Sequence, residues 1–322
     1  MSAQDSLLFV DTNIFLDFYR AMKSADFRLL GRLESIHDRI ITSGQVEMEF
    51  QKNRQKLMLA SFQKLVLKER PEIPGLFLNT PKGEKLSAAL VQVEQSLKVL
   101  KESLSGAMKN PKANDPVYKA ANDVFAFESE FNLNRAKQER YRIRRLARRR
   151  FVLGYPPRKD RDTSIGDAVN WEWIVECAKK SERSVIIVSR DGDYGLQFAG
   201  ESYLNEWLRQ EFSERVGRKS HVTLTESLSS ALKQIKVHVT PAEEEAEKNL
   251  IQTGSEQYLW ALYADAARSD AGKNLDELYK SLTEQIRLMT EGPAKRAAEL
   301  LEAQRRKRDE AKVPKPPVDP KN

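Results

Sequence analysis

Short apolar runs alternate with longer amphipathic stretches along much of the chain. Residues 7–10 (LLFV) and 184–188 (SVIIV) are apolar enough to form buried strands of a parallel sheet. Weaker strands are predicted at residues 39–42 (RIIT) and 221–224 (HVTL). Apolar residues at helical spacing lie between and around these strands, over residues 14–36, 44–68, 165–181, 201–215 and 226–236. This alternation predicts an α/β fold with a central parallel sheet.

Two regions depart from this alternation. Residues 71–155 are polar and interrupted by prolines, and we interpret them as a helical insertion. Helices within it are predicted over 84–104 and 116–150. After Pro241 the sequence becomes acid-rich, and the final residues are too charged and proline-rich to support a core. We therefore expect an α/β domain over 1–238, a helical C-terminal region over 239–305 and a disordered tail over 306–322.

The composition of the chain indicates what kind of partner it binds and in which cellular compartment it is expected. The chain has 322 residues with 54 Lys and Arg against 47 Asp and Glu, a net charge of +7, and this mild basicity fits a polyanionic partner. The single cysteine, Cys177, cannot form an intramolecular disulfide or a thiolate metal site alone. The N-terminus does not resemble a signal peptide, and no apolar stretch is long enough for a membrane span. We expect a cytoplasmic protein with no membrane contact.

Acidic residues follow the two clearest predicted strands. Asp11 closes the LLFV run, and Asp191 and Asp193 follow the SVIIV run. Ligands of open parallel sheets bind beyond the carboxyl ends of the strands, so these acids are expected to converge there. Asp11 could instead only cap the next helix, and the DGD string could be only a turn. The position of these acids at the strand ends favours a functional role, but the residue types alone leave both explanations open.

Two predicted helices add further acids. Glu47 and Glu49 flank the apolar face of the helix after the RIIT strand, and periodicity does not choose between them. Both could simply be acids favoured near a helix N-terminus. Asp167 lies three residues after Ser164, the spacing of a capping box, and that geometry also leaves a carboxylate near a helix start. Either helix could therefore place a carboxylate near the strand ends.

Several carboxylates in one cleft suit Mg²⁺ or Mn²⁺, because these cations prefer carboxylate oxygens and water. Such a site supports phosphodiester hydrolysis, which needs an activated water and compensation of phosphate charge. Other chemistries lack their residues, since the motifs of serine hydrolases, P-loop nucleotide binding, HExxH metalloproteases and dinucleotide binding do not occur in a supporting context. The three histidines, His37, His221 and His238, lack ligand spacing.

Four strings occur in the order of motifs found in the PIN domain family, within the flap-endonuclease-like nuclease superfamily. FVDTNIFLDFYR resembles the first motif, which implies that Asp11 is a catalytic metal ligand with Asn13 in its second shell. VEMEFQKNR resembles the glutamate-bearing helix of a larger PIN-like subgroup, where the acid directly precedes Phe. That resemblance selects Glu49, and not Glu47, as a catalytic metal ligand.

The other two strings complete the resemblance. YPPRKDRDTSIGDAVNW is similar to the approach to the third acid, which implies a catalytic metal-binding role for Asp167 and an accessory second-shell role for Asp160. VSRDGDYG is similar to the fourth motif, with Asp191 as the principal acid and Asp193 as a secondary metal ligand. The family resemblance implies a three-layer α/β/α sandwich, here with the insertion and the C-terminal extension added.

A strongly basic run, RAKQERYRIRRLARRRFVLGYPPRKDR, leads directly into the third acidic motif. Acids are nearly absent from it, so few cations have compensating partners along the helix, and phosphate binding explains why they occur together. The alternative is a solvated helix face. The predicted nucleic-acid-binding residues are Arg140, Arg142, Arg144, Arg145, Arg148, Arg149, Arg150, Arg158 and Lys159.

These observations predict a Mg²⁺- or Mn²⁺-dependent endonuclease that cuts RNA or single-stranded nucleic acid, with RNA favoured by the family. A toxin or antiphage defence role is compatible with the family, and the C-terminal helices could hold a protein partner or a second copy. The alternative function is an inactive PIN-fold scaffold that binds nucleic acid without cutting it. Retention of all the acids favours the nuclease.

Overall fold

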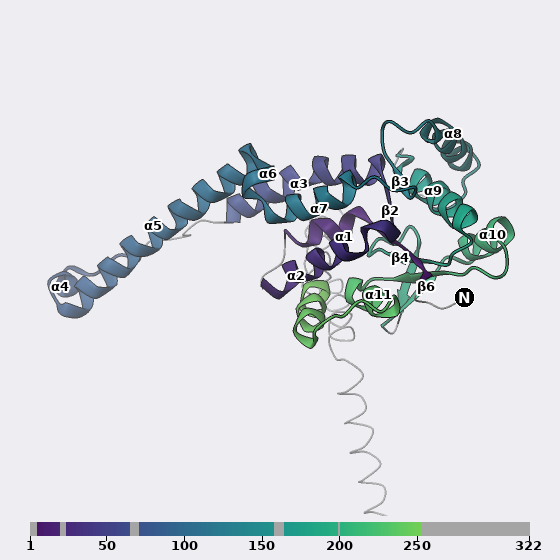
Figure 1. Cartoon of the computed structure of the whole chain (residues 1–322). Coiled ribbons are helices and arrows are strands. Elements are labelled where there is room, and N and C mark those ends of the chain that lie inside the picture. Colours follow the sequence, from purple (N-terminus) through teal and green to yellow (C-terminus); the bar gives the residue numbers. More distant parts are fainter. Residues whose placement is uncertain (1–4, 20–23, 65–70, 158–163, 199, 253–322) are drawn as a thin grey trace, which may run out of the picture. The chain divides into compact units, whose positions relative to one another are not determined.

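The computed structural model describes residues 5–19, 24–64, 71–157, 164–198 and 200–252 (Figure 1). Its first compact unit extends to Leu250 and contains the sheet with the helices around it. The predicted tail and most of the predicted C-terminal helical region lie outside the described residues.

Five parallel strands form the central sheet in the order β3-β2-β1-β4-β7. The four strands predicted from apolar runs are confirmed within one residue at each end, and β1 pairs with β2 on one side and with β4 on the other. The α/β class with a parallel sheet is therefore correct. The strands are β1 (Leu7–Val10), β2 (Ile40–Ser43), β3 (Asn132–Leu133), β4 (Val185–Val188) and β7 (Val222–Thr225).

Helices flank the sheet, as Figure 1 shows. The predicted helix over 14–36 is in fact broken: α1 ends at Asp17, and a 3-10 helix with non-helical backbone at Ile36 precedes β2. Residues 241–252 add a further helical stretch. The elements around the sheet are α1 (Thr12–Asp17), α2 (Ser24–Arg32), the 3-10 helix η2 (Leu33–Arg39), α3 (Gly44–Lys64), α9 (Gly166–Ser181), α10 (Glu206–Val216) and α11 (Leu228–Gln234).

The insertion is mainly helical, as predicted, but it also supplies strand β3 at one edge of the sheet. The prediction of a single helix over 116–150 is wrong, because the chain leaves the helix at Phe127. The Asn132 side chain donates to the carbonyls of Phe125 and Phe127, at 2.8 and 2.9 Å, and so holds the turn that leads into β3. The helices are α4 (Gly75–Leu78), α5 (Pro81–Lys109), α6 (Pro111–Asn114), α7 (Pro116–Ala126) and α8 (Glu139–Val152).

An antiparallel hairpin, β5 (Gly195–Phe198) with β6 (Glu201–Leu204), follows the acidic end of β4. The prediction of helix from residue 201 is wrong for the residues of β6. Asn205 is the N-cap of α10, and its side chain accepts from the amides of Trp207 and Leu208, so the helix starts only after it.

The core fixes the positions of the strand ends. Each of the strands β1, β2 and β4 is buried along its full length, which explains why they lack polar alternation. From α9, Trp171 and Trp173 are fully buried as well. A fully buried large apolar side chain stabilises the fold by about 1.5–3 kcal/mol, so these elements are rigid supports for the loops at the strand ends.

Among the described residues, the helices include none that is both long and apolar enough to cross a membrane.

Candidate active site

The strand order places the topological switch point of the sheet beside β1. The chain runs from β1 to β2 and β3 on one side, and later places β4 on the other side of β1. At such a switch point the loops after the two strands diverge and leave room for a ligand. Asp11 directly follows β1, and Asp191 comes shortly after β4.

Asp11 is both a helix cap and a buried acid at this point. It is the N-cap of α1, and its Oδ1 accepts from the Thr12 amide at 2.6 Å. Its Oδ2 accepts from Asn13 Nδ2 at 2.9 Å and from Ser189 Oγ at 2.6 Å. Only 5% of the residue is exposed. Capping therefore uses one oxygen, while the other connects the ends of β1 and β4.

The pKa of Asp11 is raised to about 6, mainly by burial and also by the negative charges of Asp191 and Glu49. The hydrogen bonds from Ser189 and Thr12 favour the carboxylate and oppose this shift. The direction shows that burial and neighbouring negative charge outweigh the available donors. A cation bound among these acids would favour the carboxylate and lower the pKa of Asp11.

Ser189 was not predicted as a site residue. It is almost fully buried, and its hydroxyl donates to Asp11 while accepting from the Asp191 amide at 3.1 Å. Asn13 also contacts this hydroxyl at 3.3 Å and accepts from the Arg190 amide at 3.4 Å. In the sequence, only the place of Ser189 between the VIIV strand and the DGD string could have indicated a site residue. A serine at such a place is also an ordinary loop residue.

The structure brings Glu49, from α3, close to Asp11. Glu49 Oε2 accepts from Thr12 Oγ1 at 3.3 Å, and Oε1 accepts from Gln45 Nε2 at 2.6 Å. Glu47 instead accepts from Gln51 at the exposed surface, at 3.0 Å. Glu49 is thus the glutamate of the pair that lies beside the strand ends.

Asp167 lies in the first turn of α9, where the helix approaches Glu49. A Cβ atom at Gly166 would meet the side-chain ends of Glu49 and Gln45, so a larger residue there would push Glu49 Oε1 aside. The Ser164 hydroxyl accepts from the Gly166 amide at 3.2 Å. Ile165 is the N-cap residue and no side chain caps α9. The expected capping box is therefore not formed by Ser164, because the helix begins two residues after it.

Tyr194, also not predicted, is fully buried. Its ring packs against Phe9 of β1 with centroids 6.1 Å apart. Burial raises the pKa of Tyr194, and the charges of Asp11, Asp167 and Glu49 raise it further, followed by that of Asp193. The charges of acids predicted on separate elements thus act on one buried phenol.

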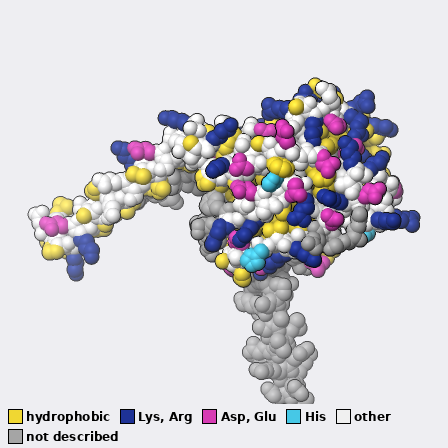
Figure 2. Space-filling model, in the orientation of Figure 1, with side chains coloured by type: hydrophobic (Ala, Val, Ile, Leu, Met, Phe, Trp, Pro, Cys, Tyr) yellow, Lys and Arg dark blue, Asp and Glu magenta, His cyan; other side chains and the backbone are white. Residues whose placement is uncertain are grey.

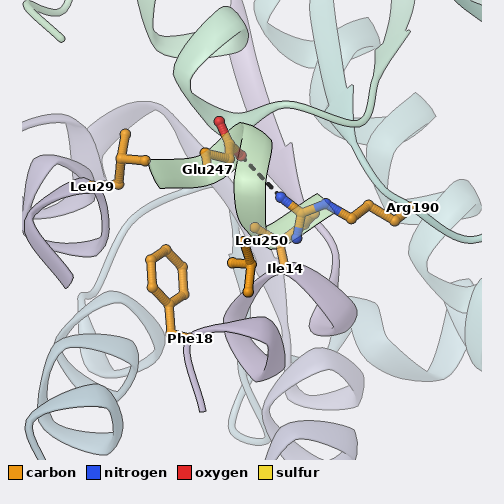
Figure 3. Close-up of a pocket in the computed structure, with 6 residues that line it drawn as sticks. All are labelled: Ile14, Phe18, Leu29, Arg190, Glu247 and Leu250. Atoms are coloured by element: carbon orange, nitrogen blue, oxygen red, sulfur yellow. Dashed lines mark hydrogen bonds and ion pairs between the residues drawn. The ribbon is translucent and has the colours of Figure 1, made fainter. Parts of the chain in front are cut away.

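Arg190 lies between Ser189 and Asp191, yet its guanidinium is held elsewhere. It pairs with Asp17 of α1 and with Glu247, the latter at 2.9 Å (Figure 3). Its Nε donates to the Glu226 carbonyl at 3.1 Å. This network fastens the end of β4. An adjacent pocket, which contains none of the candidate acids, is lined by Ile14, Phe18, Leu29, Arg190, Glu247 and Leu250 (Figure 3).

The donor chemistry of the cluster suits a hard divalent cation, because it consists of carboxylates, one of them with a raised pKa. In the part of the chain that the structure describes, no group of three His, Cys, Asp or Glu side chains is arranged to hold a metal ion. Asp11 and Glu49 face protein donors. Metal binding would therefore require these two side chains to exchange hydrogen bonds for metal bonds.

The predicted basic surface lies on α8, and Figure 2 shows Lys and Arg side chains gathered over this helix. Arg140 is half-buried. Arg150 differs from its neighbours, since it is only 3% exposed and its guanidinium contacts Glu172, Glu211 and the Pro156 carbonyl. These contacts leave it no role in binding phosphate. The exposed arginines of α8 are Arg142, Arg144, Arg145, Arg148 and Arg149.

Helix α8 packs antiparallel to α9. Arg142 near its start pairs with Glu176, at 2.6 Å, and Arg150 near its end pairs with Glu172, at 3.0 Å. The end of α8 is consequently the part closer to the start of α9, where Asp167 lies. Three predicted residues, Arg158, Lys159 and Asp160, lie outside the described residues.

The fold and the acids define a class of α/β protein with a carboxylate cluster at the switch point of a parallel sheet. The PIN domain family model matches residues 8–194, more than half of the chain, so this chain belongs to the PIN domain family. PIN domains are nuclease-type folds and usually depend on divalent metal ions. Neither the comparison with curated proteins nor that with solved structures gave a match.

Proposed function

We propose that the protein is a Mg²⁺- or Mn²⁺-dependent endonuclease acting on RNA or single-stranded nucleic acid. One observation carries this proposal. Among the described residues six carboxylates are buried, and all but Asp11 form an ion pair with an arginine. The six are Asp11, Asp17, Asp115, Glu172, Glu243 and Glu247. An uncompensated buried acid is costly, and a functional cation is the simplest reason to retain it.

The acids of the proposed site would share one role, which is to bind the cation. Asp11, Glu49, Asp167 and Asp191 would hold the cation, and Asp193 would support it. Asn13 and Ser189 orient Asp11 by donating to its Oδ2. A bound divalent cation supplies an activated water and offsets negative charge on the scissile phosphate.

The exposed arginines Arg144, Arg145, Arg148 and Arg149 of α8 support a nucleic-acid substrate, because an exposed arginine can neutralise a backbone phosphate without reading sequence. Their position along α9 leads toward Asp167. The preference for RNA, and a role as a toxin or antiphage effector, rest on the family resemblance.

The test is cleavage of end-labelled RNA and single-stranded DNA by the full chain with Mg²⁺, Mn²⁺ or EDTA. We expect metal-dependent cleavage that Asp11→Asn reduces by more than about 100-fold, since even second-shell changes typically cost 10–100-fold. Asp167→Asn and Asp191→Asn should act alike, because residues sharing a metal act as a unit.

The matched control lies on the same helix. Glu49→Gln should reduce cleavage by at least about tenfold, whereas Glu47→Gln, at the exposed surface, should leave it within about twofold of wild type. Equal effects of the two substitutions on cleavage would contradict the assignment of Glu49 as the metal-binding glutamate. Binding of nucleic acid without cleavage by wild type under every metal condition would instead support the scaffold alternative.

The substrate path has its own test. Replacing Arg144, Arg145, Arg148 and Arg149 with Gln should weaken binding and reduce the slope of log K against log salt by roughly 3 to 4 units, if all contact phosphate. The rate at saturating substrate should fall much less. An unchanged slope would make α8 an ordinary solvated helix face.

A further inference from the structure

The hydroxyl of Tyr194 is a buried polar group without a hydrogen-bond partner among the described residues. The residue has no exposed surface, so bulk solvent does not supply a partner. Leaving a buried hydroxyl unsatisfied costs about 1–3 kcal/mol. Such a group in a native fold needs an explanation, and a ligand or water that binds there is one of the few.

The position of this hydroxyl indicates what the missing partner is. The charges that act on it are those of Asp11, Asp167, Glu49 and Asp193, which come from four separate segments of the chain. The ring is held against Phe9 of β1, and the Tyr194 carbonyl accepts from the Asn205 amide at 2.8 Å, so both side chain and backbone are fixed. The phenol is therefore a rigidly held donor on which the charges of the carboxylates act.

Asp11, the first of these acids, already has its hydrogen bonds. Its oxygens accept from Thr12, Asn13 and Ser189. Glu49 likewise accepts from Gln45 and Thr12. Because Asp11 and Glu49 already accept from other donors, a group that arrives with the cation is a suitable partner for the phenol. Magnesium and manganese usually keep several waters when carboxylates bind them.

We propose that Tyr194 is a positioning residue of the metal site, whose hydroxyl hydrogen-bonds a water of the cation's hydration shell. The inference rests on the proposed function, because it assumes that the acids bind a divalent cation. Tyr194 would act through that water and would not itself ligate the metal. Outer-shell groups of this kind typically change metal affinity by about 10–100-fold.

The experiment compares two tyrosine-to-phenylalanine variants of the full chain. Tyr194→Phe removes the hydroxyl that lacks a partner. Tyr19→Phe removes a half-buried hydroxyl that donates to Asp115 at 2.7 Å and accepts from Arg54 at 3.0 Å, in contacts that involve none of the candidate acids. Mn²⁺ affinity is measured by calorimetry, and the melting temperature is measured without metal.

We expect Tyr194→Phe to weaken Mn²⁺ binding by about tenfold or more while its metal-free melting temperature is unchanged or higher. Tyr19→Phe should melt lower and bind Mn²⁺ as wild type does. Adding Mg²⁺ to wild type should also give a tyrosine ultraviolet difference band that Tyr194→Phe lacks. This band reports the phenol directly, and a purely structural role would not produce it.

The two failures can be told apart. Wild-type Mn²⁺ binding that Asp11→Asn abolishes, combined with equal affinity in Tyr194→Phe and no difference band, would overturn the role of Tyr194 alone. Absence of Mn²⁺ binding by wild type, or binding that Asp11→Asn does not change, would overturn the proposed function as well.

Discussion

The protein treats its buried acids in two different ways. At the contact of α8, α9 and α10, Glu172 lies between Arg150 and Arg215, and Glu211 joins the same network. Burial alone would raise the pKa of Glu172, but the hydrogen bonds and charges of Arg215 and Arg150 outweigh it and lower that pKa. At the end of β1, Asp11 has only neutral donors among the described residues, and its pKa is raised to about 6.

The difference separates the ion-paired acids of the fold from the acid that we propose to bind the metal ion. A fold that pairs Glu172, Asp115 and Glu247 with arginines is evidently able to neutralise buried carboxylates. Arg190 makes the point within one loop, because it sits beside Asp191 in sequence and yet its guanidinium pairs with Asp17 and Glu247. Leaving Asp11 without a cation therefore stores negative charge where a metal ion could use it.

The largest expected effect comes from breaking the paired region. Arg150→Met keeps a long buried side chain but leaves Glu172 and Glu211 with Arg215 alone. Removing one partner of a buried ion pair costs about 3–5 kcal/mol, which urea denaturation would measure. Arg149→Met, on the exposed face of the same helix, should change stability by less than about 0.5 kcal/mol. Similar effects of both variants would remove the distinction between them.

A somewhat smaller effect should come from the titration of Asp11. Its pKa is about 6 in the folded state and near 3.8 when unfolded, so between these values the folded state binds more protons. Metal-free stability should consequently fall as pH rises through this window. Relative to Asp11→Asn, wild type should lose up to about 3 kcal/mol between about pH 4 and pH 7.

The comparison with Asp11→Asn across pH cancels any constant change in hydrogen bonding at residue 11. Mg²⁺ at neutral pH should restore stability to wild type and not to the variant. A pH-independent difference between the two proteins would mean that Asp11 is compensated in solution and that the contrast with Glu172 is not real.

The smallest effect is expected from the exposed ion pair between Arg142 and Glu176. Arg142 is 43% exposed on its side chain, so solvent screens the pair even though its charges lower the pKa of Glu176. Arg142→Gln should therefore cost less than about 1 kcal/mol in thermal or urea unfolding. A loss of stability comparable with that of Arg150→Met would show that burial does not determine how much an ion pair contributes to stability.

Much of this arrangement was determined locally by the sequence. The runs LLFV and VIIV have no polar alternation, as expected of strands buried on both faces, and acids that follow parallel strands are expected at the same edge of the sheet. Four motifs in order were enough to identify the family, which the match over residues 8–194 confirms.

Other features depended on contacts between distant residues. Local pattern predicted one helix where α7, β3 and α8 stand, because the side-chain bonds of Asn132 and the pairing of β3 with β2 are tertiary. It also grouped Arg150 with its exposed neighbours, although helix packing turned this arginine toward Glu172.

Within the site, the sequence supplied the acids and the tertiary structure supplied their environment. Helical periodicity left Glu47 and Glu49 equivalent, and the approach of α3 to α9 at Gly166 brought Glu49 to the strand ends. By sequence pattern, Ser189 and Tyr194 are ordinary loop residues. Only the tertiary structure shows that the Ser189 hydroxyl donates to Asp11 and that the Tyr194 hydroxyl is buried without a partner among the described residues. Hydrophobic periodicity is encoded in neighbouring residues, whereas the charge balance of a buried cluster depends on residues far apart in the chain that the fold places together.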